Sequence, residues 1–308
     1  MAFGKGNVSN SQQAEYPKYT GITPCSLVAL NPDRSTLEEM GISVYEDPMY
    51  IKTREIDGQN VREALVTIYL KPEGKIRGKN VNIRPIRLTF SILDKLFYNK
   101  DQTKVQIIDK YGNTAWATVE EYKEKKIPVY KNGQSANIDK DYHAAYMGEA
   151  MLIKFIKAFL DLDDWKIYSN EQQCYVEHPN LSLCEASLDN INNLFQGDFS
   201  EIAYCLGSQP NNYVKCLLGV RYSVEGNCYQ TIFPYHFMKN RARKIDDFNK
   251  ELNSIVERGG EQHSDYIVGE LQEFNTTPTN IQENIDTTNT PPVQNSVPSY
   301  APADDLPF

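Results

Sequence analysis

The sharpest change in composition along the chain falls near Phe274, and it limits what can fold. Between Asn275 and Pro302 the sequence consists mostly of Thr, Asn, Pro and Gln, contains no Lys or Arg, and shows neither a helical nor a strand period. Such a segment cannot bury enough apolar surface to offset the entropy of ordering it. We therefore expect residues 275–302 to be a disordered linker, with the folded body before it.

Charge is divided unevenly between the two parts of the chain. The whole sequence has a net charge of -9, but twelve acids and two bases lie from Ile245 to the end, which gives that part -10. Residues 1–244 hold 30 bases and 29 acids and are almost neutral. An asymmetry of this kind is more informative than the total, and a neutral body is compatible with a basic groove.

The body is predicted to consist mainly of strands. Residues 64–70 alternate Ala64, Val66, Ile68 and Leu70 with Leu65, Thr67 and Tyr69, which is a period-2 pattern. Further strands are expected at Pro24–Leu30, Met49–Ile56, Val81–Ile92, Lys104–Asp109, Thr114–Val119, Tyr213–Tyr222 and Cys228–Phe233. Helices are expected at 33–41, His143–Leu162, Ser187–Phe195 and Ile245–Val256. The fold class is therefore a β-rich α+β body with inserted helices, for which an OB-like β-barrel is the closest small architecture.

A cluster of bases suggests where an anion would bind. Six bases and one acid, Glu73, lie in the 17 residues from 71 to 87, and Gly74 and Gly78 predict a flexible loop within the cluster. Pro85 predicts a bulge that turns Arg84 and Arg87 outward. Such a cluster attracts phosphates, although a solvated hairpin loop is the plainer interpretation. Its bases are Lys71, Lys75, Arg77, Lys79, Arg84 and Arg87.

Aromatic residues on neighbouring strands could stack on bases. Tyr69 is expected on the face opposite the core, Tyr111 lies in a hairpin turn, and Trp116 occupies the polar face of its strand. Base stacking on such rings contributes about 1–3 kcal/mol per base. A helix packed over Trp116 would explain it equally well.

A second set of bases lies near the end of the body. Lys215 and Arg221 are expected on the outward face of Tyr213–Tyr222. Tyr235, His236 and Phe237 precede four more bases between residues 239 and 244. This set could form the far wall of a groove, dock the acidic tail, or be a solvated helix start.

Several functional classes lack sequence support. The chain has no Walker-type loop, Gly-x-Ser-x-Gly or His-Glu-x-x-His motif, so we do not expect an enzyme or a cofactor. It has no apolar run that could span a membrane or act as a secretory signal. Its six cysteines form no Cys-x-x-Cys pair and are expected to be reduced, as in a cytoplasm. Two alternatives remain: zinc bound by Cys174, Cys184, Cys205 and His178, and a nuclease metal bound by Asp161, Asp163 and Asp164.

The end of the chain carries a recognisable motif. Asp304-Asp305-Leu306-Pro307-Phe308 resembles the acidic C-terminal tip of bacterial and phage single-stranded-DNA-binding proteins, in which a run of Asp precedes Ile or Leu and a terminal Pro-Phe. Residues 19–41, with Thr20-Gly21 and Asn31-Pro32, resemble the N-terminal part of replication-module binding proteins of crAss-like tailed phages. The resemblance implies that the tip recruits replication and recombination proteins, with Phe308 offering a ring and a carboxylate to a pocket.

Together these patterns predict a protein that binds and protects single-stranded DNA during replication, recombination or repair, in the cytoplasm of a bacterial host if phage-encoded. The expected parts are a flexible start (1–18), the DNA-binding body (19–244), an acidic helical segment (245–274), the linker (275–302) and the tip (303–308). The DNA-binding candidates are Tyr69, Lys71, Lys75, Arg77, Lys79, Arg84, Arg87, Tyr111, Trp116, Lys215 and Arg221. The alternative is a non-catalytic protein-interaction or recombination-mediator protein that does not bind the strand directly. The oligomeric state is left open, a homo-oligomer included.

Overall fold

The computed structural model describes residues 17–109, 113–125, 138, 142–162, 166–182, 191–208, 212–222, 228–238 and 269–274. For residues 222 and 234–238 it describes the backbone alone. Tyr111, the expected helix at 245–256, the linker and the tip lie outside these ranges. Among the described residues, no helix has the length and apolar character needed to cross a bilayer.

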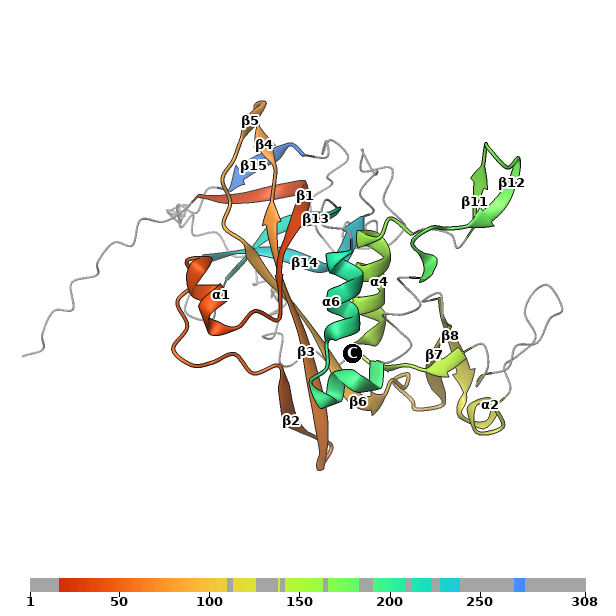
Figure 1. Ribbon diagram of the computed structural model, residues 1–308. Helices are drawn as coiled ribbons and strands as arrows, with labels where there is room; N and C mark the ends of the chain where they lie inside the picture. Colours follow the sequence, from red (N-terminus) through yellow and green to blue (C-terminus); the bar gives the residue numbers. More distant parts are fainter. Residues whose placement is uncertain are drawn as a thin grey trace, which may run out of the picture.

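A large antiparallel sheet forms the centre of the body (Figure 1). Its main path runs β10-β6-β3-β1-β13-β14, and β2 and β15 add to β3 and β1 respectively. The bounds are β1 Lys18–Leu30, β2 Ile51–Ile56, β3 Gln59–Pro72, β6 Ile86–Leu96, β10 Tyr146–Met147, β13 Tyr213–Tyr222, β14 Cys228–Met238 and β15 Leu271–Phe274. The described strands thus form open sheets and no closed barrel. The expected strand-rich body with inserted helices is confirmed, whereas its OB-like form is not.

Three smaller sheets surround the large one. β7 (Lys104–Asp109) pairs with β8 (Thr114–Thr118) and β9 (Tyr142–Ala144). The other two are hairpins, β4 (Lys75–Ile76) with β5 (Lys79–Asn80) and β11 (Lys166–Ser169) with β12 (Cys174–Glu177). Figure 1 shows the β4–β5 hairpin and the three-stranded sheet at different ends of the molecule.

The core lies between one face of the large sheet and the helices. In β3, Ala64, Val66, Ile68 and Leu70 are fully buried, as their alternation predicts. They belong to one cluster with residues of α4 (Glu149–Phe159), η1 (Ile191–Gln196) and α6 (Ser200–Gly207). The ring centroids of Phe90 and Phe155 lie 5.4 Å apart across this interface. Figure 1 shows α4 and α6 on one side of β3 and α1 (Arg34–Glu39) on the other.

The helix expected at 143–162 is shorter than predicted. It begins only at Glu149, because Gly148 adopts a left-handed conformation with φ 85°. A Cβ at position 148 would lie 1.9 Å from the carbonyl oxygen of Ser91, so only glycine fits here. The residues before it belong to strands β9 and β10.

The structure confirms one further predicted helix and corrects the predictions for Pro85 and for residues 271–274. The helix beginning after Asp33 is confirmed, with the Asp33 carboxylate accepting a hydrogen bond from the Thr36 amide (2.8 Å). The strand containing Pro85 has no bulge there, because β6 starts immediately after the proline. Within the segment expected to be helical, residues 271–274 form strand β15 instead. Helix α6 and the β11–β12 hairpin had no counterpart among the elements expected from the sequence.

Candidate nucleic-acid interface

The six clustered bases all lie at the surface. Lys71 is the last residue but one of β3, Lys75 and Lys79 lie on the β4–β5 hairpin, and Arg77 lies in the turn of that hairpin. Arg77 and Gly78 both have positive φ, 49° and 77°, which suits a tight two-residue hairpin turn. The expected flexible loop is therefore an ordered hairpin. We call Lys71, Lys75, Arg77, Lys79, Arg84 and Arg87 the basic strip, and each of its members is exposed.

The start of the β4–β5 hairpin is held in place by β15 and the two residues before it. The Lys75 amide donates to the carbonyl of Gly269 (2.7 Å), and Lys75 forms a parallel bridge with Glu270. Leu271 is only 4 % exposed and belongs to the main core. A Cβ on Gly74 would come within 2.3 Å of the Leu271 side chain, so the glycine permits this close approach. The last residues of the acidic segment (245–274) thus pack against the start of the β4–β5 hairpin, which carries three bases of the basic strip.

Tyr69 does not occupy the open face on which it was expected. It is 6 % exposed, lies opposite Arg87 on β6, and receives a hydrogen bond from that guanidinium. The segment around α1 covers this face, since Asn31 and Tyr50 hydrogen-bond to the backbone of Thr67 and Leu65. Burial raises the pKa of Tyr69, and burial together with the neighbouring Tyr69 raises the pKa of Tyr50 to about 12. Tyr69 therefore presents no ring face to a ligand.

Trp116 lies on an exposed face of the three-stranded sheet. Its side chain is 40 % exposed, and its ring centroid lies 5.6 Å from that of Phe97. Strand register places Gln106 directly opposite Trp116, and Lys104 on the same face opposite Thr118. This combination of a ring, an amide and a base is typical of a surface that holds a single nucleic-acid strand.

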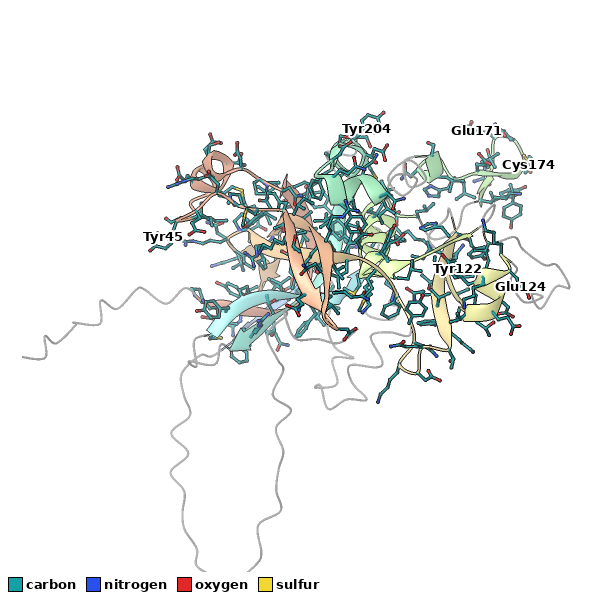
Figure 2. All side chains as sticks on the ribbon, turned by 90° about the horizontal axis from the view of Figure 1, so that it is seen from below. Tyr45, Tyr122, Glu124, Glu171, Cys174 and Tyr204 are labelled. Atoms are coloured by element: carbon teal, nitrogen blue, oxygen red, sulfur yellow. The ribbon has the colours of Figure 1, made fainter. Side chains whose placement is uncertain are left out.

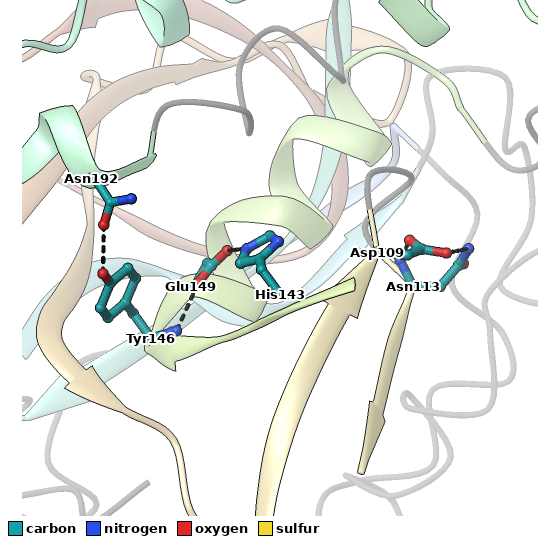
Figure 3. Close-up of polar contacts among 6 residues, drawn as sticks. All are labelled: Asp109, Asn113, His143, Tyr146, Glu149 and Asn192. Carbon is teal, nitrogen blue, oxygen red and sulfur yellow. Dashed lines mark hydrogen bonds and ion pairs between the residues drawn. The ribbon is translucent and has the colours of Figure 1, made fainter. Parts of the chain in front are cut away.

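Polar contacts attach the three-stranded sheet to the body (Figure 3). The carboxylate of Glu149, fully buried at the start of α4, accepts from the Tyr146 amide (2.7 Å) and pairs with His143 Nε2 (2.9 Å). His143 belongs to β9, which pairs with β7. β7 also pairs with β8, the strand that contains Trp116. Where β7 ends and β8 is about to begin, Asp109 accepts two hydrogen bonds from Asn113. The Glu149 contacts fix the position of the three-stranded sheet, and with it Trp116, relative to the core.

The basic strip and Trp116 do not share one face. Figure 1 places the β4–β5 hairpin and strand β8 at opposite ends of the molecule, separated by the large sheet and its helices. A single groove that combines them, as the sequence suggested, is therefore not formed. A strand contacting both would have to pass around the body.

The second basic set is only partly exposed. Lys215 lies on the same face of β13 as Arg221 but is only 8 % exposed, so its expected exposure is wrong, whereas Arg221 is exposed. Opposite Arg221 lies Tyr229, 54 % exposed, and Phe233 on the same strand is 38 % exposed. Neither ring was among the residues expected to bind DNA, although the alternation of Tyr229, Thr231 and Phe233 in an expected strand was the signal that could have identified them.

The proposed metal ligands are dispersed where the structure describes them. Cys174 is exposed in the β11–β12 hairpin, whereas Cys205 is buried in α6. Figure 2 shows Cys174 and Glu171 at the periphery, remote from Tyr45 at the other side of the body. Within the described ranges, no three His, Cys, Asp or Glu residues gather in a metal-binding arrangement. Cys184, Asp163 and Asp164 lie outside those ranges.

Comparison with known proteins finds no matching family model, no matching curated protein and no matching solved structure.

Proposed function

We propose that this protein binds single-stranded DNA and uses its C-terminal tip to recruit proteins that act on the strand. The observation that carries the proposal is the basic strip, whose six cations are all exposed around one ordered hairpin. Cations so arranged contact phosphates without regard to sequence. The resemblance of Asp304–Phe308 to the tips of single-stranded-DNA-binding proteins supports the second half of the proposal.

In this proposal the parts have different roles. The basic strip holds the sugar–phosphate backbone, and the Trp116 face, with Lys104 beside it, holds unpaired bases. The acidic tip, on a linker that gives reach, presents Phe308 to a partner pocket. Asp304 and Asp305 would speed the encounter more than they tighten the complex.

The proposal is tested by titrating a fluorescein-labelled oligo(dT) with the full chain at two or more salt concentrations, followed by polarisation. A duplex of equal length serves as the competitor control. We expect salt-sensitive binding of the single strand and weak binding of the duplex. Each phosphate contact contributes about -0.7 to the slope of log K against log salt for a single strand. Arg77→Ala and Lys79→Ala should each reduce the slope by that amount, whereas Lys52→Ala, an exposed cation on β2, should not.

A second candidate function is favoured by the burial of Tyr69. A tail-bearing interaction protein needs no strand-binding face, and the aromatic part of the expected groove is absent at Tyr69 because that ring is covered. If the full chain and a variant lacking residues 303–308 both fail to bind oligo(dT) at low salt, this second function replaces the first.

A further inference from the structure

One end of the large sheet has an outward face to which the proposed function gives no role. β13 lies beside β1, and β14 beside β13, so that Arg221 directly faces Tyr229 and Gly219 faces Thr231. Leu218 and Ile232, on the opposite face, are buried in the core. Alternation therefore places Gly219 and Arg221 outward.

Two aromatic rings are exposed on this face. Tyr229 is 54 % exposed and Phe233 is 38 % exposed. The Phe233 ring lies directly over Gly219, because a Cβ at that position would come within 2.3 Å of Phe233 Cε2. The glycine thus lets the ring pack closely against the backbone while its other side remains open to solvent. Arg221, also exposed, lies directly opposite Tyr229 and two residues along β13 from Gly219.

Strands β1, β13 and β14 contain no Asp or Glu. Of their three bases, Arg221 is exposed, Lys18 is half-buried and Lys215 is buried. On β15, which pairs with β1, the carboxylate of Glu273 lies on the opposite face beside Tyr19. The outward side chains there are Gln272 and Phe274, and the same alternation places Glu270, which bridges to Lys75, on that side next to β4. A ligand that meets the Arg221 end of this face encounters two rings and a cation, which favours a molecule with flat apolar surfaces and negative charge.

The same end of the sheet carries the basic strip. Locally the strands follow the order β14-β13-β1-β15-β4, since β15 pairs with β1 and bridges to Lys75 of β4. Four strand spacings of about 4.8 Å separate β14 from β4, or about 19 Å. That distance corresponds to about six phosphates at the stacked spacing of about 3.4 Å per strand. A short oligonucleotide can therefore reach both features.

We propose that Tyr229, Phe233 and Arg221 form a base-stacking platform, on which unpaired bases lie against the two rings while Arg221 contacts a phosphate. The inference rests on the proposed function, because it assigns to the same single strand a site for its bases beside the basic strip. Stacking on ring faces tolerates any base, so the platform supplies affinity without sequence preference. It would supply the aromatic contacts that the buried Tyr69 cannot.

The test compares full-length variants in the oligo(dT) titration. Tyr229→Leu and Phe233→Leu keep apolar bulk but remove a ring face, and each should weaken binding by about 5- to 150-fold. Because neither change removes a charge, the salt slope should stay as in the wild type. Gly219→Ala displaces the Phe233 ring without removing it and should also weaken binding. Tyr204→Leu, at an exposed tyrosine on α6, is the matched control and should bind normally.

A second readout locates the contact directly. Photo-cross-linking of an oligonucleotide bearing 5-iododeoxyuridine, followed by mass spectrometry, should label the peptide that contains residues 228–233. Circular dichroism melting of each variant establishes that it is folded. If wild-type protein binds with the expected salt dependence but the three platform variants bind equally well and cross-links fall elsewhere, the platform is wrong and the proposed function stands. If wild-type protein does not bind at all, both are wrong.

Discussion

Leu271 should act as the anchor that fixes strand β15 to the body. Its side chain is 4 % exposed and packs between Gly21 and Gly74, where an added Cβ atom would lie 3.2 Å and 2.3 Å from it respectively. Replacing a buried leucine by alanine costs about 2–5 kcal/mol. Since β15 has only four residues and the notch can partly collapse, we expect Leu271→Ala to cost about 2 kcal/mol, which is about a 30-fold change in an opening equilibrium.

Hydrogen exchange measured by mass spectrometry separates local release of β15 from global unfolding. In Leu271→Ala, amides of residues 269–274 and of the paired residues 18–21 should lose about 30-fold in protection. Amides at the centre of β3 should be less affected, because they are protected until the whole sheet opens. Gln272→Ala, at the exposed neighbouring position, is the control. Unchanged protection of both segments in Leu271→Ala would show that the strand is held by its backbone hydrogen bonds and that Leu271 is not the anchor.

Three further predictions concern stability, each measured by urea denaturation. Gly148→Ala should lower the free energy of unfolding by about 2–4 kcal/mol, since it adds both backbone strain and a clash. The control Gly41→Ala, at φ 73° with no atom within 4 Å of the added Cβ, should lower it by about 1 kcal/mol. Equal losses of stability in the two variants would contradict this prediction. Glu149→Ala leaves the Tyr146 amide and His143 without their acceptor and should cost about 1–3 kcal/mol, and Glu149→Gln should cost less. Between pH 10 and 12 the unfolded chain loses the Tyr50 proton before the folded one does, so stability should fall as pH rises, and Tyr50→Phe should flatten this dependence.

Local pattern was sufficient to predict the strands that build the core. The alternation in β3 predicts a strand buried on one face, and the hairpin pattern predicts that β7 pairs with β8; the structure agrees with both. The start of α4 could not be predicted in the same way. The close contact of Gly148 with Ser91, far away in the sequence, shows why the helix begins where it does.

The candidate site was harder to predict, because exposure depends on what packs against each face. Tyr69 and Tyr229 both occupy outward positions of well-predicted strands. The segment around α1 folds over the first and leaves the second open, and nothing in the strand sequences distinguishes the two cases. The exposure of the basic strip was easier to predict, since six bases within 17 residues, three of them on a tight hairpin, can hardly all be buried.

Strand β15 illustrates how one buried side chain can control the electrostatics of a surface. Side chains alternate along a strand, so a register shift of one residue would exchange its two faces. In the present register Leu271 and Glu273 share the core-side face, and Gln272 and Phe274 lie outward. A shift would place the Glu273 carboxylate beside Lys18 and Arg221, where it would compete with an anionic ligand. The notch formed by Gly21 and Gly74 holds Leu271 in the present register, and this register keeps the Glu273 carboxylate off the outward face of β1, β13 and β15, although the strand belongs to the acidic part of the chain.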